Sequence, residues 1–140
     1  MGTIPKTPEH LNKVVVAFLN GGRIKGFSSD FSPLNDSFNL LPQENPHQSQ
    51  AVKVELKDLK AVFFVWDFAG HSNYQESSPA DSTLHGRKIE VTFSDGEKLA
   101  GRTEGYNSQR LGFFMFPVDP RSNNIRIFVV TKNTRQVRLL

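Results

Sequence analysis

A few side chains in this sequence have the types needed for catalysis or metal binding. The histidines are His10, His47, His71 and His85, and no two have the spacing that would place both imidazoles on one face of a strand or helix. Ser82, His85 and Asp81 are the residue types of a nucleophilic triad, but close neighbours on a polar stretch are not held in triad geometry. The chain has no cysteine, which excludes thiol catalysis and thiolate metal sites. We therefore expect a protein that is not an enzyme and that has no cofactor and no metal.

Basic side chains are the second kind of functional candidate. The chain has 17 basic and 14 acidic residues, a net charge of +3. Residues 13–65 hold six basic against five acidic side chains, whereas residues 88–140 hold nine against five. The excess gathers at Arg121, Arg126, Lys132, Arg135 and Arg138. Such a basic face could attract RNA, a nucleotide or an acidic protein, and a solubilising sheet edge explains the same charges equally well.

The elements that must position these residues follow from an internal repeat. The chain matches itself without a gap at an offset of 75 residues, because 88 minus 13 is 75. The identical pairs are Lys13/Lys88, Val16/Val91, Phe18/Phe93, Gly21/Gly96, Gly26/Gly101, Phe38/Phe113, Pro42/Pro117, Val54/Val129, Lys57/Lys132 and Val62/Val137. Turn glycines, strand glycines and apolar residues keep register throughout, which indicates two copies of one module, at residues 13–65 and 88–140.

Each module has the pattern of five short strands. Asn20-Gly21 and Asp95-Gly96 supply the positive φ angles of tight hairpin turns, and a glycine within the second strand, Gly26 or Gly101, indicates sharp curvature. The third and fourth strands are expected near residues 38–42 and 52–56, or 113–117 and 125–130. A single 3₁₀ turn then leads into the last strand, at 61–68 or 135–140. Five such short strands fit a small, strongly bent barrel.

The apolar pattern predicts that the two barrels pack together. Residues 61–66 are apolar on both faces of their strand, so both faces must be covered, and residues 112–116 and 125–130 have the same excess. This predicts an all-β fold of two tandem barrels packed as a pseudo-symmetric pair. The expected organisation is an N-terminal tail at 1–12, a first barrel at 13–68, a polar linker at 69–86 and a second barrel at 87–140.

No segment has the properties of a membrane anchor or a secretion leader. The longest apolar runs, residues 14–19 and 61–66, are far shorter than the roughly 20 residues that a spanning helix needs. The first residues, Met1 to Lys6, contain no apolar stretch. We therefore expect a cytoplasmic protein without a membrane partner.

The strand order, the string Asn20-Gly21-x-x-Ile24-x-Gly26 and its repeat Asp95-Gly96-x-x-Leu99-x-Gly101 resemble Sm-like domains, including the bacterial host-factor RNA chaperone. SH3-like barrels share part of this pattern. The resemblance implies nucleic-acid contacts from an aromatic side chain early in strand three and from basic or polar side chains before strand five. The matching candidates are Phe38 with Lys57, and Phe113 with Lys132 and Asn133, with Lys60, Arg126 and Arg135 as further basic candidates. Core packing of the two phenylalanines and solvated turn lysines are the alternatives.

Assembly is a further property that the resemblance implies. Sm-like domains commonly pair strand four of one subunit with strand five of the next, and here the covalent neighbour can take that place. We expect strand 61–68 to pair with strand 125–130, leaving the charged strands 51–57 and 135–140 as free edges. The expected state is a two-barrel monomer.

A closer likeness is to an uncharacterised bacterial family. It rests on Lys60-Ala61-Val62-Phe63-Phe64-Val65, on Gly86-Arg87-Lys88-x-Glu90-Val91-x-Phe93-x-Asp95-Gly96-Glu97, and on Gly112-Phe113-Phe114-x-Phe116-Pro117. This family implies no particular activity. We expect a non-enzymatic binding module for protein interaction or assembly, and binding of single-stranded RNA or another anionic ligand is the alternative.

Overall fold

The computed structural model describes residues 11–43, 50–69, 86–119 and 121–140, and within them the fold is all-β, as predicted. The first module consists of β1 (Asn12–Phe18), β2 (Arg23–Ser28), β3 (Ser37–Pro42), β4 (Val52–Glu55) and β5 (Leu59–Val65). The second module consists of β6 (Arg87–Phe93), β7 (Lys98–Thr103), β8 (Gly112–Met115), β9 (Asn124–Val130) and β10 (Thr134–Leu139). Two single 3₁₀ turns, η1 (Leu56–Asp58) and η2 (Thr131–Asn133), precede β5 and β10.

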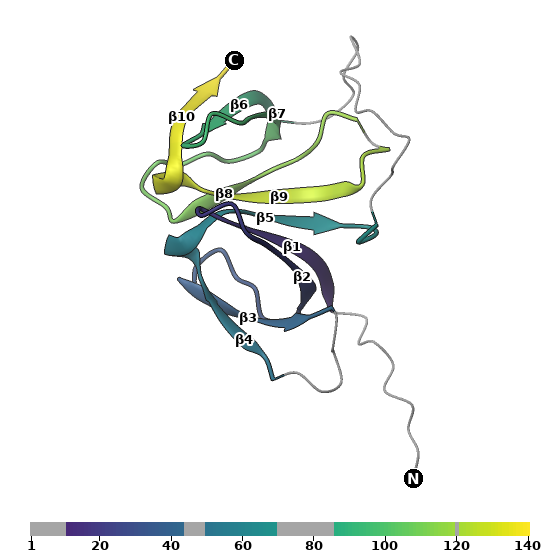
Figure 1. The fold of residues 1–140 in the computed structure, drawn as a ribbon. Helices are drawn as coiled ribbons and strands as arrows, with labels where there is room; N and C mark the ends of the chain where they lie inside the picture. Colours follow the sequence, from purple (N-terminus) through teal and green to yellow (C-terminus); the bar gives the residue numbers. More distant parts are fainter. Residues whose placement is uncertain (1–10, 44–49, 70–85, 120) are drawn as a thin grey trace.

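The strands form two antiparallel sheets. The larger sheet has the order β4-β3-β2-β1-β5-β9-β8, and the smaller has the order β10-β6-β7. β5 and β9 lie side by side where the two modules meet (Figure 1), with Ala61 opposite Val129 and Phe63 opposite Ile127. The predicted pairing of strand 61–68 with strand 125–130 is thus confirmed for residues 61–65. A bridge between Arg102 and Phe116 links β7 to β8 and joins the small sheet to the large one.

Backbone pairing in the first module recurs in the second in the same register. In each module the first strand pairs with both the second and the fifth strand. Corresponding pairs are Val14–Gly26 with Ile89–Gly101, Val16–Val62 with Val91–Val137, and Phe38–Val54 with Phe113–Val129. The sequence offset of 75 residues is therefore also the offset between equivalent strand positions.

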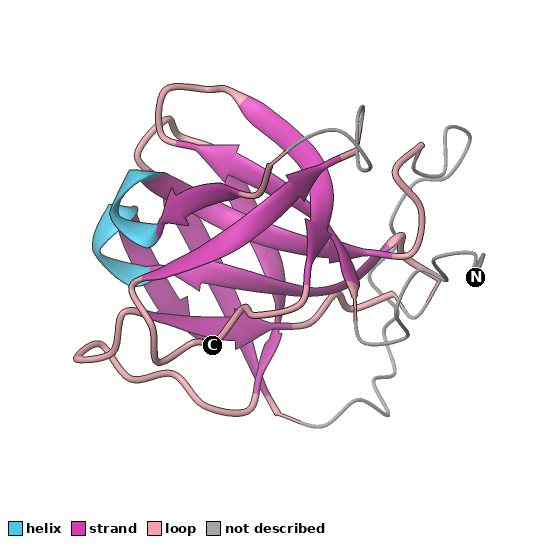
Figure 2. Ribbon diagram, turned by 90° about the horizontal axis from the view of Figure 1, so that it is seen from below, coloured by secondary structure: helices cyan, strands magenta, loops and turns pink. Residues whose placement is uncertain are grey.

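The hairpin turns and the 3₁₀ turns lie where the sequence predicts them. Gly21 and Gly96 have φ angles of 93° and 92°, a region that glycine adopts without steric cost. The side chain before each glycine completes the turn, because Asn20 Oδ1 accepts from Gly22 N–H at 2.8 Å and Asp95 Oδ1 accepts from Glu97 N–H at 2.9 Å. Both 3₁₀ turns lie together at one end of the strands (Figure 2).

Two hydrophobic cores share the central strands. The first core contains Val62 and Phe64 of β5 together with Phe128 and Val130 of β9. The second core contains Ala61, Phe63 and Val65 from the opposite face of β5. Every residue of β5 is buried, because each face of the strand packs into a different core. The prediction that the modules bury these apolar surfaces together is confirmed.

The predicted limits of the last strand of the first module were wrong at both ends. β5 begins at Leu59, which pairs with Phe18 directly after the three-residue turn η1. It ends at Val65, and a register shift in its pairing with β9 lies between Phe64 and Val65. Trp66, expected to be covered, is instead 62% exposed.

The predicted tail and linker lie mostly outside the described residues. β1 begins at Asn12, one residue before the expected module boundary, and β6 begins at Arg87. In the part of the chain that the structure describes, no helix has the length and apolar character required to cross a lipid bilayer.

A candidate binding groove between the modules

The two phenylalanines predicted to stack on nucleic acid are core residues. Phe38 lies in the first core and Phe113 in the second, and each is only 3% exposed. Phe31 packs edge-on against Phe38 at 5.2 Å, and Tyr106 packs edge-on against Phe113 at 5.0 Å. The stacking interpretation is wrong because alternation along β3 and β8 points these rings inward, and the core alternative is confirmed.

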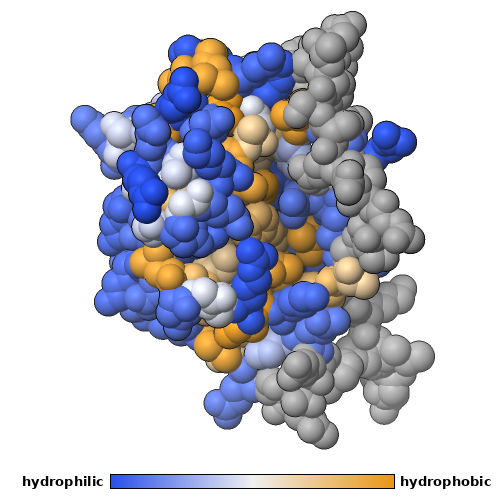
Figure 3. All heavy atoms as spheres, turned by 45° about the horizontal axis from the view of Figure 1, so that its top comes forward, coloured by the Kyte–Doolittle hydropathy of each residue, from blue (hydrophilic) through white to orange (hydrophobic). Residues whose placement is uncertain are grey.

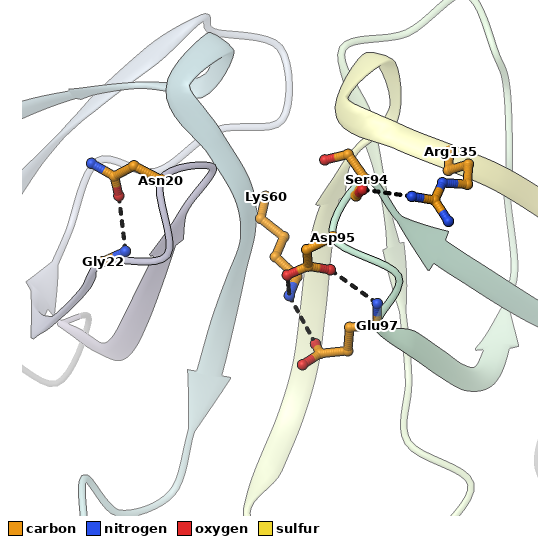
Figure 4. A network of polar contacts seen from close by, with 7 residues as sticks. All are labelled: Asn20, Gly22, Lys60, Ser94, Asp95, Glu97 and Arg135. Carbon is orange, nitrogen blue, oxygen red and sulfur yellow. Dashed lines mark hydrogen bonds and ion pairs between the residues drawn. The ribbon is translucent and has the colours of Figure 1, made fainter.

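Lys60 joins the two modules and is not available to a ligand. Its Nζ lies 2.8 Å from Asp95 Oδ2 and 3.1 Å from Glu97 Oε1, and 4.8 Å from the centre of the Phe93 ring (Figure 4). The hydrogen bond from Lys60, followed by that from Glu97 N–H, lowers the pKa of the Asp95 carboxyl below its ordinary value. Lys60 itself is 7% exposed, so we correct its assignment from ligand contact to contact between modules.

Asn133 is a second residue of this junction. Its Nδ2 group donates to the carbonyl oxygens of Lys57 at 3.0 Å and Leu59 at 2.7 Å. Both amide hydrogens are therefore used to hold η2 against η1, which leaves no side-chain donor for a nucleic acid.

Lys57 and Lys132 do come together, at a cavity of about 280 Å³ between the modules. Asp36 and Glu55 line the same cavity, and Lys57 Nζ lies 3.3 Å from Glu55 Oε2. Two acidic side chains balance the two lysines, so this cavity is not a strongly positive site.

The remaining predicted cations have separate local contacts. The Arg126 guanidinium lies 4.4 Å from the ring centres of both Phe64 and Phe114, and burial lowers its pKa. Arg135 Nη2 donates to Ser94 O at 2.8 Å. Arg138 lies 3.7 Å from a Glu90 oxygen, and Arg121 lies 3.9 Å from an Asp119 oxygen. Proximity in sequence thus does not produce one shared binding site.

The other chemical candidates fall outside the described residues. All four histidines lie there, as do Ser82 and Asp81. Among the described residues, no group of three histidine, aspartate or glutamate side chains is placed to hold a metal ion.

A groove of about 490 Å³ lies where the β6–β7 hairpin crosses the first module. Val15, Phe63 and Val65 of the central strands contribute apolar lining. Arg23 and Lys25 line it from β2, whereas Lys98, Leu99 and Glu97 line it from the second module, with Asn123 and Asn124 completing the groove. Arg23 and Lys25 also line a neighbouring hollow of about 520 Å³, so the cations of β2 border two concave surfaces.

The charge of the groove is positive. Its single acidic side chain, Glu97, is bound by Lys60, whereas Lys98 has no ion pair within the described residues. Lys25 Nζ donates to Phe68 O at 2.8 Å and keeps its charge, and the Arg23 guanidinium lies 5.5 Å from the centre of the Phe63 ring. The groove therefore presents three cations beside apolar side chains, a combination suited to a ligand with acidic and apolar groups.

Trp66 lies next to this groove. It follows the lining residue Val65, and its backbone N–H donates to the backbone carbonyl oxygen of Asn123, another lining residue, at 2.9 Å. The Trp66 side chain is mostly exposed and is not part of the described groove lining.

One sequence signal relates two of the basic residues that line the groove. Arg23 and Lys98 are equivalent positions, because 98 minus 23 is 75, and both are basic residues at the start of the second strand of their module. The signal does not show that they line one groove, because this depends on how the modules pack.

The chain matches a protein-family model over most of its length. The model of the Family of unknown function (DUF6982) matches residues 10–140. The chain belongs to this family. No curated protein matches it, and no solved structure does. The predicted likeness to a family without an assigned activity is confirmed at that level, and the match covers all the groove residues of this DUF6982 chain.

The groove of the DUF6982 chain carries one carboxylate, that of Glu97, beside basic, amide and apolar groups. Its described lining offers guanidinium, ammonium, amide and apolar groups, and contains no serine, threonine or histidine. Guanidinium and ammonium groups bind carboxylates or phosphates, and the apolar surface favours aliphatic side chains.

Proposed function

We propose that this DUF6982 chain is a non-enzymatic binding module, and that an acidic, partly apolar segment of a protein partner binds in the groove between its modules. The observation that carries the proposal is the placement of Arg23, Lys25 and Lys98 around Val15, Phe63 and Val65. The cations attract carboxylates, and burial of aliphatic side chains on the apolar surface adds affinity.

A protein partner fits this groove better than RNA does. The one aromatic ring in the groove, Phe63, is 7% exposed and lies beneath the Arg23 guanidinium, so it offers no open face to a base. Binding of single strands depends on such open aromatic faces. Apolar surface bordered by hydrophilic side chains is also visible on the face shown in Figure 3, as is common at protein interfaces.

Fluorescence of the single tryptophan, Trp66, provides the test. We would titrate the full chain with a peptide of alternating glutamate and leucine, with a peptide in which lysine replaces glutamate, and with single-stranded oligouridine. The expected result is binding of the acidic peptide alone, weakened by salt. Arg23→Glu with Lys98→Glu should weaken it at least about tenfold, since two attractive contacts become repulsive.

Lys53→Glu is the matched control for the single variant Arg23→Glu, because it makes the same charge change at an exposed position of β4, outside the groove. An equal loss of peptide binding in the Lys53→Glu variant would show that net charge, not the groove, is responsible. Absence of acidic-peptide binding at low salt would count against the proposal.

Binding of single-stranded RNA or another anion is the second candidate function. It is supported by Lys57 and Lys132, which line the same cavity. If this is the function, oligouridine binds and the acidic peptide does not. Lys132→Glu should then weaken RNA binding uniformly across sequences and reduce its dependence on salt. Unchanged RNA binding in that variant would exclude this cavity as the RNA site.

We also infer that each module is a small Sm-like barrel. Pairing of the first strand with both the second and the fifth strand, and the 3₁₀ turn before the fifth, support this relationship. The recurrence of strand register between modules supports an origin by internal duplication.

A further inference from the structure

The strands at the two ends of the molecule are equivalent to the two strands that join its modules. β10 takes the place of β5 in the second module, and β4 takes the place of β9 in the first. Both are end strands in the sheet order. A second copy of the chain could therefore extend the sheet by pairing its β4 with β10, in the way that β9 pairs with β5.

The side chains that would meet in such a contact are mismatched. Of the five opposed pairs between β5 and β9, Phe64–Arg126 and Val65–Asn124 set an apolar side chain against a charged or polar one. The other three, Ala61–Val129, Val62–Phe128 and Phe63–Ile127, are apolar. The equivalent pairs between copies would be Gln136–Val54, Val137–Lys53 and Arg138–Val52. Each of these three outer pairs sets a polar or charged side chain against an apolar one, and burying the polar group without a partner is unfavourable.

The ion pairs of the junction also have no equivalent at the outer edges. Arg135 occupies the position of Lys60, but the positions of Asp95 and Glu97 are occupied by Asn20 and Gly22 in the first module (Figure 4). An incoming copy would therefore present no carboxylate to Arg135. The Arg135 side chain instead donates to Ser94 O within its own module.

The hydrogen bonds of Asn133 would become repulsive contacts. Its equivalent is Asp58, because 133 minus 75 is 58. Where Asn133 donates to two carbonyl oxygens, Asp58 of a second copy would place a carboxylate against the carbonyls of Lys132 and Thr134. A carboxylate has no proton to donate at neutral pH, so the contact is unfavourable.

We infer that these substitutions restrict strand pairing to the junction inside the chain, so that β4 and β10 do not accept a second copy. The backbone geometry of the repeat would allow β4 of one copy to pair with β10 of another. The side chains make this pairing unfavourable. Specificity of this kind combines favourable contacts with the correct partner and unfavourable ones with the incorrect partner.

Restoring the junction residues at the outer edges tests the inference. The variant carries Lys53→Phe, Gln136→Ala and Arg138→Phe for the apolar pairs, and Asn20→Asp, Gly22→Glu and Asp58→Asn for the polar contacts. A Cβ at Gly22 would meet only the flexible Asn20 side chain, at 3.1 Å, so glutamate fits there. We expect wild type to be monomeric in light scattering at tens of micromolar, and the variant to associate at least about 100-fold more tightly.

A matched control separates specific strand pairing from non-specific association of apolar side chains. It carries the three apolar substitutions but keeps Asn20, Gly22 and Asp58, and should associate at least about tenfold more weakly than the six-residue variant. Hydrogen exchange should show new protection of β4 and β10 amides in the six-residue variant alone. Assembly of wild type with protected β4 and β10 would overturn the inference, and so would a folded six-residue variant that stays monomeric.

The three polar substitutions alone are the reserve variant if the six-residue variant does not fold, because all three positions are exposed. Sedimentation should then show an association constant at least about tenfold above wild type. An association constant equal to that of wild type would overturn the inference.

Discussion

Lys60 carries its charge at a position where little of the residue is exposed, between two acidic side chains of the other module. Lys60→Met keeps much of the length of the side chain and removes the charge. We expect the free energy of unfolding, measured by urea denaturation, to fall by about 1 kcal/mol, because both acids are partly exposed and water screens the pairs. Lys57→Met, which removes a surface pair, should change it by less than about 0.5 kcal/mol. Equal effects would contradict the role of Lys60 as a junction residue.

The stabilisation by Lys60 should depend on pH through Asp95. The pKa of Asp95 is lower in the folded protein than its ordinary value of 3.8, so folding favours the ionised carboxylate. The contribution is therefore fully present above pH 3.8 and is lost as the pH falls through the lower, folded-state value. The difference in stability between wild type and Lys60→Met should be constant near neutral pH and should narrow in acid. A difference that widened in acid would contradict this assignment.

Replacing Asn133 with aspartate should destabilise the protein more than replacing it with alanine. Alanine removes two donors, whereas aspartate sets a carboxylate against the carbonyls of Lys57 and Leu59. We expect Asn133→Ala to lower the free energy of unfolding by about 1 kcal/mol and Asn133→Asp by about 2 kcal/mol. Thermal denaturation at neutral pH ranks the stability of the two variants. An equal loss of stability in both would show that repulsion between the carboxylate and the carbonyl oxygens makes no contribution.

At the scale of the strands, β9 is part of the second module in sequence but contributes side chains to both cores. Phe128 is fully buried in the first core although it lies in the second module. Phe128→Ala should lower the free energy of unfolding by about 3 to 5 kcal/mol and should reduce hydrogen-exchange protection in β1 and β3. Phe116→Ala, at a partly exposed site, should cost less than about 1 kcal/mol. Loss of protection confined to the second module would contradict the shared core.

The sequence predicted these strands well because strand and turn patterns depend on residues that are close together in the chain. The turns at Gly21 and Gly96, the 3₁₀ turns and the central pairing of β5 with β9 all follow from residues within the repeat or from apolar strand faces. The end of β5 at Val65 was not predicted, because the apolar residues Trp66 and Phe68 continue the sequence pattern beyond the last residue of the strand. The site was predicted least well: residue type could not distinguish Lys60, held between two acids, from a lysine open to a ligand.

For the whole molecule, the shared cores predict that neither module folds alone. Separating residues 1–72 from residues 84–140 would remove Phe128 and Val130 from the first core and Phe63 and Val65 from the second. Small domains have little stability to lose, so each half should be unfolded or aggregated, and mixing the halves should restore dispersed amide spectra. Two separate halves that are each monomeric and well dispersed would contradict this prediction.

The sharing of β9 also fixes when the fold can form during translation. Synthesis proceeds from the amino terminus, so β1 to β5 leave the ribosome before residues 124–130 are made. Until then the first core lacks Phe128 and Val130, and the opposite face of β5 has nothing to cover it. Many proteins complete an N-terminal domain while the rest is still being made. In this chain the first core cannot be completed until β9 has left the ribosome. Until then its apolar strands stay exposed and can be bound by chaperones.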